Sequence, residues 1–137
     1  MCSFIDTCGG FMFEKLNFSL IYSGIVQSCI LIYDVTDTNS FNWCKKKLEE
    51  LEEIFIFAKK GIKVYLIGNK IDLEDKRVVS KEDGYNLSLD YNLIYMETSC
   101  KYYYNVVNTF ETILIETYNY LRTNNRFENE KINLYKK

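Results

Sequence analysis

Three short apolar runs alternate with longer segments of helical periodicity, and this alternation is what most constrains the fold. The runs cover residues 28–35, 64–67 and 93–96, and each is bounded by polar residues or glycine. Apolar runs of this length are typical of strands that are buried on both faces of a sheet. Strands that alternate with helices pair in parallel. The sequence therefore predicts an α/β fold, with helices on both faces of one parallel sheet.

Helical spacing fills the segments between these runs. Apolar residues recur at steps of three and four from Cys44 to Ala58, which indicates an amphipathic helix. Residues 80–83 (Ser-Lys-Glu-Asp) resemble a capping box, so a second helix is expected to run from there to about Leu89. A third, longer amphipathic helix is expected over residues 106–121. We assign one domain to residues 1–121 and a polar extension to residues 122–137.

Length and charge narrow the class of protein. A chain of 137 residues, 47 % of them hydrophobic and 26 % charged, fits one globular domain. The formal charge of −2 argues against a nucleic-acid partner, because such proteins usually carry a basic excess. No apolar run approaches the ~18 residues that a membrane span needs. We therefore expect a cytoplasmic protein without a transmembrane segment.

The cysteines argue against both a disulfide framework and a zinc site. There are five of them at scattered spacings, no CxxC pair, and no histidine anywhere in the chain. This usage is typical of reduced side chains in a reducing compartment. No cysteine follows Cys100, so we expect no C-terminal prenylation motif.

The clearest chemical signal directly follows the second apolar run, where Asn69, Lys70 and Asp72 form the pattern Asn-Lys-x-Asp. Guanine presents two adjacent N–H donors, and one carboxylate accepts both in a charge-assisted pair. Adenine lacks this pair of donors, so a site of this kind discriminates by ~10⁴ or more. We assign Asp72 to the base edge, the alkyl stem of Lys70 to the base face, and Asn69 to joining the loop to its neighbours. The alternative is a polar loop between a strand and a helix.

A second loop, residues 97–101 (Glu-Thr-Ser-Cys-Lys), closes the third run. The small side chains of Ser99 and Cys100 let backbone amides approach a ligand carbonyl, and Lys101 is placed to cover the base from its other face. Ligands bind beyond the carboxyl ends of parallel strands, so we expect both loops at one site. Ser99 is also expected to cap the following helix.

A third and weaker signal is the string Asp-Thr-Cys-Gly-Gly at residues 6–10. Asp6, at the end of an apolar stub, is suited to hold Mg²⁺ through a water molecule. Gly9 is suited to offer its amide to a γ-phosphate, because no Cβ blocks the approach. Tight turns use the same residues, so this string alone does not specify a phosphate site.

The order of these three motifs resembles the Ras superfamily of small GTPases. Residues 33–36 (Tyr-Asp-Val-Thr), with Ser40 and Phe41, resemble its Rab branch most. The resemblance runs from about Phe4 to about Leu121. It implies a P-loop-type small GTPase fold, GTP or GDP with Mg²⁺ as cofactors, trafficking effectors and regulators as partners, and a place at endomembranes. The residues implied to bind guanine are Asn69, Lys70, Asp72, Ser99, Cys100 and Lys101, with Gly9 near the phosphates and Asp6 near the metal.

The chain departs from the family pattern in its phosphate-binding part. It contains no GxxxxGK[ST] loop and no switch I, so we expect a fold that lacks the first strand of the family. In the family's sheet that strand lies between the one ending at Asp6 and the one at residues 28–35. We therefore expect this truncated chain to fold poorly or to repack when it is alone. Gly10 occupies the position of the catalytic glutamine, so impaired or absent hydrolysis is expected.

These departures leave several functions open. Residues 40–44 (Ser-Phe-Asn-Trp-Cys), with Leu48, also resemble the Rab-like GTPase subunit of intraflagellar transport, which implies a ciliary place. The first hypothesis is a guanine-nucleotide switch in vesicular or intraflagellar trafficking. The second is a non-catalytic interaction module of a trafficking complex, and the third is a truncated fragment without function.

Overall fold

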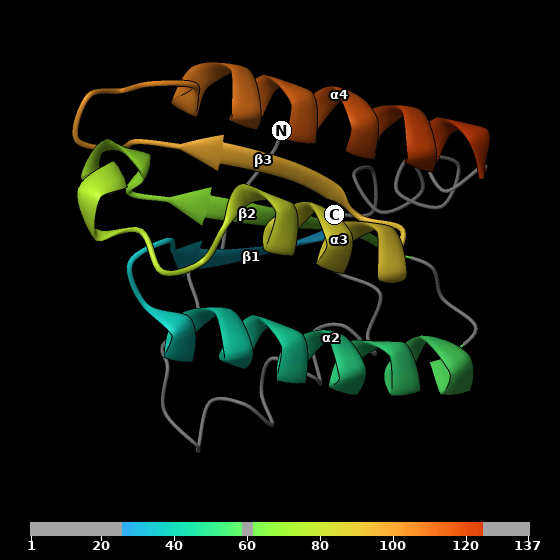
Figure 1. Ribbon diagram of the computed structural model, residues 1–137. Helices are drawn as coiled ribbons and strands as arrows, with labels where there is room; N and C mark the ends of the chain where they lie inside the picture. The colour runs from blue at the N-terminus through green and yellow to red at the C-terminus, as the bar shows by residue number, and fades with distance from the viewer. Residues whose placement is uncertain (1–25, 59–61, 125–137) are drawn as a thin grey trace, which may run out of the picture.

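The computed structural model describes residues 26–58 and 62–124, which form a three-stranded parallel sheet and its covering helices (Figure 1). The strands are β1 (Ser28–Asp34), β2 (Lys63–Asn69) and β3 (Ile94–Thr98), and they lie in the order β1-β2-β3. β1 pairs with β2 along all seven of its residues. The predicted α/β fold with a parallel sheet is confirmed, and it is consistent with a small GTPase fold.

Helices cover both faces of this sheet (Figure 1). α2 (Thr38–Ala58) and α3 (Lys81–Asp90) pack on one face, and α4 (Val106–Thr123) packs on the other. A short 3-10 helix, η1 (Ile71–Lys76), connects β2 toward α3. All three predicted helices are present. α2 begins at Thr38, ahead of the apolar stripe from which it was predicted.

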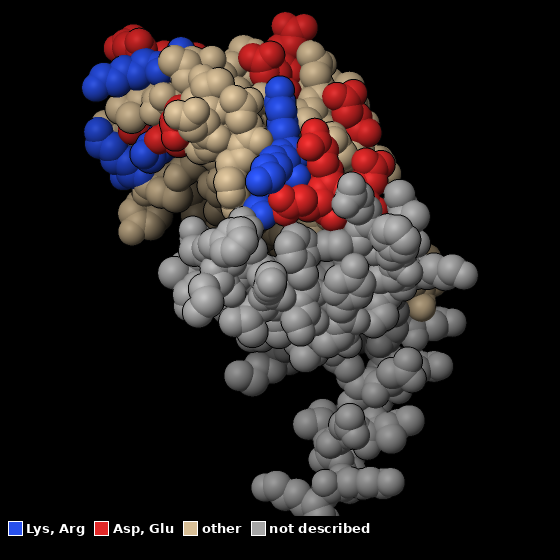
Figure 2. Space-filling model, turned by 90° about the horizontal axis from the view of Figure 1, so that it is seen from below, with Lys and Arg blue, Asp and Glu red and all other residues tan. Residues whose placement is uncertain are grey.

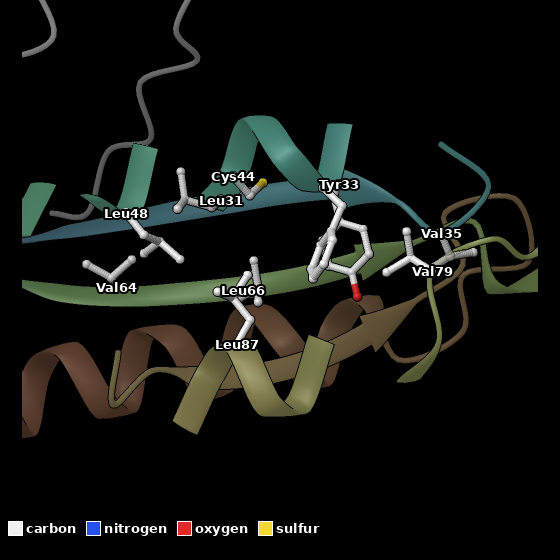
Figure 3. Close-up of a cluster of buried hydrophobic side chains, with 10 residues drawn as sticks. Leu31, Tyr33, Val35, Cys44, Leu48, Val64, Leu66, Val79 and Leu87 are labelled. Atoms are coloured by element: carbon white, nitrogen blue, oxygen red, sulfur yellow. The ribbon is translucent and has the colours of Figure 1, made fainter. Parts of the chain in front are cut away.

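The larger hydrophobic core lies between the sheet and the pair α2 and α3. Figure 3 shows its side chains reaching from β1 and β2 toward these two helices. On the other face, Tyr65 and Ile67 of β2 pack against Ile113 of α4. The prediction that residues 28–35 are buried on both faces is wrong in one respect: Ile32 is 53 % exposed. The hydrophobic cluster between the sheet and α4 reaches Ile30 of β1 but not Ile32.

The third strand is shifted from its predicted position. We expected residues 93–96 to be buried, whereas β3 runs over Ile94–Thr98 and only Thr98 is fully buried. Within the described part of the chain, β3 pairs with β2 alone and therefore stands at the edge of the sheet. The shift places Glu97 and Thr98 inside the strand, so that they pair with Gly68 and Asn69 of β2.

The capping box that was predicted at the start of α3 is present. The Ser80 hydroxyl accepts a hydrogen bond from the Asp83 amide (3.0 Å), and the Asp83 carboxylate accepts one from the Ser80 amide (3.1 Å). Two N–H groups that lack partners within the helix are thereby satisfied. This cap fixes where α3 begins and therefore where Gly84 meets the sheet.

The outer side of α2 is a polar surface of mixed charge. Figure 2 views this side of the molecule and shows lysine and arginine side chains lying among aspartates and glutamates. On α2, Lys47 and Glu50 form an ion pair of 2.7 Å. None of the helices formed by the described residues is both long enough and apolar enough to span a membrane.

Several sequence predictions concern residues outside the described ranges. Asp6, Gly9 and Gly10, with their predicted phosphate and metal contacts, fall there, as does the segment 125–137. The division at residue 121 and the poor folding of the isolated chain also stay predictions, although α4 itself continues to Thr123.

Candidate guanine-base site

The predicted site lies where β2 and β3 end side by side. Their register pairs Asn69 directly with Thr98, so the loops that follow the two strands start next to each other. The Asn69 side-chain oxygen accepts hydrogen bonds from the Thr98 hydroxyl (3.2 Å) and from the Cys100 amide (3.3 Å). Asn69 therefore joins the two loops at the carboxyl edge of the sheet, which is where parallel sheets bind ligands.

Asp72 is held by the second loop through Ser99. The Ser99 hydroxyl donates to Asp72 Oδ1 (2.6 Å) and accepts from the Tyr102 amide (3.3 Å). Asp72 Oδ2 makes no hydrogen bond within the described ranges. The carboxylate is thus fixed by one oxygen, and its other lone pairs are available to a ligand.

The prediction that Ser99 caps the next helix is wrong. α4 begins at Val106 and its N-cap is Asn105, which has a left-handed backbone (φ 58°) and makes no side-chain cap. Ser99 lies before a closed turn instead, because its amide and carbonyl both bond to Tyr104 (3.1 and 3.0 Å). The turn occupies the residues between Ser99 and the helix, so the Ser99 hydroxyl is directed to Asp72.

Lys70 reaches across to the end of β1. Its backbone is left-handed (φ 67°), and its ammonium lies 2.5 Å from Asp34 Oδ2, while half of the side chain is exposed. Asp34 also accepts hydrogen bonds from the amide and the hydroxyl of Thr36 (2.8 and 2.7 Å). Lys70 is therefore anchored at its charged end, with its alkyl stem beside the loop that carries Asp72.

The remaining predicted residues line the second loop. Cys100 and Lys101 are both exposed, and the Lys101 ammonium lies 5.0 Å from the centre of the Tyr102 ring, which is a cation–π contact. Tyr102, Tyr103 and Tyr104 are exposed as well. The two loops thus supply a carboxylate, an exposed turn and two lysines around one edge of the sheet.

This set of groups fits the edge of guanine. A carboxylate with free lone pairs matches the two N–H donors of the base, and Asp72 forms no salt bridge in the described part of the chain. The residues predicted to contact Mg²⁺ and the phosphates, Asp6 and Gly9, lie outside the described ranges. Among the described residues, no three side chains of His, Cys, Asp or Glu gather in a way that would hold a metal ion.

Comparison with known proteins decides the family. A sequence model of the Ras family matches residues 1–119 of the 137-residue chain. The chain belongs to the Ras family. The match includes both loops of the candidate site and the string at residues 6–10.

Similar Ras-family relatives are Rab-related, which confirms the predicted branch. The chain is 38 % identical over 108 residues to Ras-related protein Rab-8A of Bos taurus, a match that covers 79 % of this chain and 50 % of the relative. It is 39 % identical over 127 residues to Ras-related protein RGP1 of Oryza sativa subsp. japonica, covering 93 % and 54 %. The chain therefore spans about half the length of the curated relatives it matches.

Two features of this candidate site were missed by sequence reasoning. The first feature is Asp34, which pairs with Lys70. Asp34 ends β1, and its position at the carboxyl end of a strand could have identified it as a residue of the site. The second feature is a largely buried ion pair beneath the loops: Arg77 donates to both carboxylate oxygens of Glu97 (2.9 and 3.4 Å), and the two side chains are 14 % and 13 % exposed. Glu97 belonged to a recognised motif, but nothing in the spacing identified Arg77 as its partner.

The Asp34–Lys70 pair predicts a specific dependence of stability on pH. Burial raises the pKa of Asp34, but hydrogen bonds from Lys70 and Thr36 outweigh it and hold the pKa below its ordinary value of 3.8. A carboxyl group with a lowered pKa in the folded state stabilises that state above its unfolded pKa, and this stabilisation is lost as the pH falls through the folded pKa. We expect Asp34→Asn to be less stable than the wild type at pH 6, with the difference shrinking below about pH 4.

Urea unfolding followed by circular dichroism at several pH values measures this difference. Asp83, whose pKa is lowered by its hydrogen bonds from Ser80, supplies the matched control. Asp83→Asn should leave the contribution of Asp34 intact, so the effects of the two substitutions should add. A constant gap between the wild type and Asp34→Asn from pH 6 to pH 2 would show that the pair is not coupled to protonation.

Proposed function

We propose that this chain recognises the base of a guanine nucleotide as part of a Rab-type molecular switch in membrane trafficking. One observation supports the assignment above the others: Asp72 is fixed through Oδ1 by Ser99 and keeps Oδ2 available at the carboxyl edge of the sheet. Its partners would be a guanine nucleotide together with trafficking effectors and regulators.

The base contacts follow from the geometry of the two loops. Asp72 accepts the N1 and N2 hydrogens of guanine, and the Ser99 hydroxyl keeps the carboxylate plane in one orientation. The Cys100 amide is held only by a long bond of 3.3 Å to Asn69, and it is placed to donate to the guanine carbonyl. The stems of Lys70 and Lys101 cover the two faces of the base. GTP and Mg²⁺ would supply the switch that orders or releases adjoining segments.

Nucleotide titration of the full chain tests this proposal directly. Isotope-labelled protein is titrated with GDP, ADP or IDP, and the backbone amide signals of the two loops are followed by NMR. GDP should shift Cys100 and its neighbours, IDP should act more weakly because inosine lacks the N2 amine, and ADP should leave these signals in place. Equal responses to GDP and ADP would exclude base recognition by Asp72.

A second candidate is a non-catalytic interaction module of a trafficking complex. It is favoured by Gly10, which stands where the family has its catalytic glutamine, and by the exposed tyrosines 102–104. A module of this kind needs no turnover. Turnover of GTP at a rate stimulated by a regulator protein would rule it out.

A further inference from the structure

A continuous chain of side-chain hydrogen bonds lies beneath the two loops of the candidate site. The Tyr95 hydroxyl donates to Glu97 Oε1 (2.8 Å), the oxygen that Arg77 Nη1 also contacts (2.9 Å). The Tyr33 hydroxyl lies 3.0 Å from that of Tyr95. A phenol has a single proton, and Tyr95 gives its proton to Glu97, so Tyr33 is the donor to Tyr95. The chain therefore runs in one direction, from β1 through β3 to Glu97.

Close packing holds both phenols in place. Tyr33 is only 1 % exposed, and Figure 3 shows its hydroxyl oxygen pointing away from α2. The opposite wall is Gly84 of α3, where an added Cβ would lie 2.5 Å from the Tyr33 hydroxyl and 2.6 Å from Tyr95 Cζ. A side chain at residue 84 would leave no room for the two hydroxyls. Burial, with the hydrogen bonds to Tyr33 and Glu97, raises the pKa of Tyr95, so it stays a donor.

Glu97 connects this chain of bonds to the site. It directly precedes Thr98 and Ser99, the residues whose hydroxyls bond to Asn69 and Asp72. Its partner Arg77 caps η1, the short helix that carries Asp72, and the Arg77 side chain also donates to the Val79 carbonyl (3.2 Å). Through Arg77, the Glu97 carboxylate is thus bound to the segment that follows the loop of Asp72. Glu97 is itself the first residue of the loop that carries Ser99.

We propose that Tyr95, oriented by Tyr33, is a positioning residue that holds Glu97 and thereby sets the spacing of the two guanine-binding loops. The role in binding rests on the proposed function, whereas the role in loop geometry does not. The competing explanation is that the Tyr95 hydroxyl only satisfies the core and adds stability without any effect on the loops.

Tyr65 offers a matched control for this distinction. It is a fully buried tyrosine of the neighbouring strand, and its hydroxyl bonds to the Ile113 carbonyl (3.2 Å) and the Thr117 hydroxyl (3.0 Å) on the other face of the sheet. Tyr95→Phe and Tyr65→Phe each remove one hydroxyl with two hydrogen bonds. Only the first of these hydroxyls contacts Glu97.

The experiment measures amide hydrogen exchange in the full chain for the wild type and both variants. The amides of Cys100 and Tyr102 report on the loops, because they bond to Asn69 and Ser99, and the central amides of β2 report global stability. After correction for global stability, Tyr95→Phe should speed exchange at Cys100 and Tyr102 roughly two- to thirtyfold, and Tyr65→Phe should not. GDP binding should weaken by a similar factor in Tyr95→Phe alone.

Equal loop exchange in the two variants would overturn the positioning role, because the Tyr95 hydroxyl would then act on stability only. A wild-type chain that does not respond to GDP would refute the proposed function instead. In that case the exchange rates would still decide whether Tyr95 sets the loop geometry. Tyr33→Phe, which keeps the bond from Tyr95 to Glu97, should give an effect in the same direction and smaller than that of Tyr95→Phe.

Discussion

Replacement of Asp72 by asparagine should abolish the preference of the chain for guanine over other bases. The carboxylate accepts two N–H groups, whereas an amide offers one acceptor and one donor, so one N–H of guanine would face another N–H. A site that depends on such a pair loses ~10⁴ or more in discrimination when the pair is broken. The measurement is the ratio of the dissociation constants for GDP and ADP, obtained by NMR titration of the wild type and Asp72→Asn.

A change of base supplies the counterpart of this substitution. Xanthine carries a carbonyl where guanine has its N2 amine, so the asparagine amide of the variant would donate to it. We therefore expect Asp72→Asn to prefer xanthosine diphosphate over GDP, which is the reverse of the wild type. Asp75→Asn, an exposed change within the same short helix, is the control and should leave both ratios unchanged. If Asp72→Asn still prefers guanine, residues other than Asp72 recognise the base.

Of the substitutions proposed for this chain, removal of the Glu97 side chain should lower the free energy of unfolding the most. Breaking a buried ion pair by removing one partner costs ~3–5 kcal/mol, because the remaining charge stays buried. Arg77 would keep its bond to Glu74 (2.8 Å), a side chain that is mostly exposed, and its bond to the Val79 carbonyl (3.2 Å). Since folded proteins are stable by only ~5–15 kcal/mol, Glu97→Ala should remove a large share of the total. Urea unfolding followed by circular dichroism measures the loss.

Glu116→Ala is a suitable comparison for this substitution. Glu116 pairs with Lys63 at 3.9 Å, and both side chains are at least one-third exposed. An exposed pair contributes ~0–1 kcal/mol, so its loss should be small. Glu97→Gln keeps an acceptor for the Tyr95 hydroxyl. Its loss of stability should therefore lie between those of Glu97→Ala and Glu116→Ala. Equal costs for Glu97→Ala and Glu116→Ala would mean that the Arg77–Glu97 pair is effectively solvated.

The sequence predicted the sheet and the meeting of the two loops, but not the contacts that fix them. Apolar runs and helical spacing locate strands and helices, and parallel pairing brings the ends of β2 and β3 together. These patterns do not say which side chain finds which partner. Arg77 and Glu97 are twenty residues apart in the sequence. Tyr33 and Tyr95 are sixty-two apart, and their hydroxyls meet in the space that Gly84 leaves open.

Local signals were wrong at Ser99 and incomplete at Lys70, because each side chain has a partner from a distant part of the chain. Ser99 had the residue type of a helix cap, but the turn closed by Tyr104 separates it from α4 and leaves its hydroxyl to Asp72. The assignment of the Lys70 stem to the base face stays a prediction, but its motif did not indicate that its ammonium pairs with Asp34 of another strand. In both cases the side chain binds a partner from a different strand or loop. A local sequence pattern does not contain that partner.

The register of the sheet also has a consequence for the order of folding. The pair Tyr65–Ile94 begins the contact between β2 and β3, and it joins residues that are 94 − 65 = 29 positions apart. Contacts between distant parts of a chain form slowly, because the intervening loop must first be closed. The two halves of the site meet only across this pair of strands. During refolding we therefore expect the Cys100 amide to become protected only when β2 and β3 pair, so that a chain able to bind a base is one in which this part of the sheet has formed.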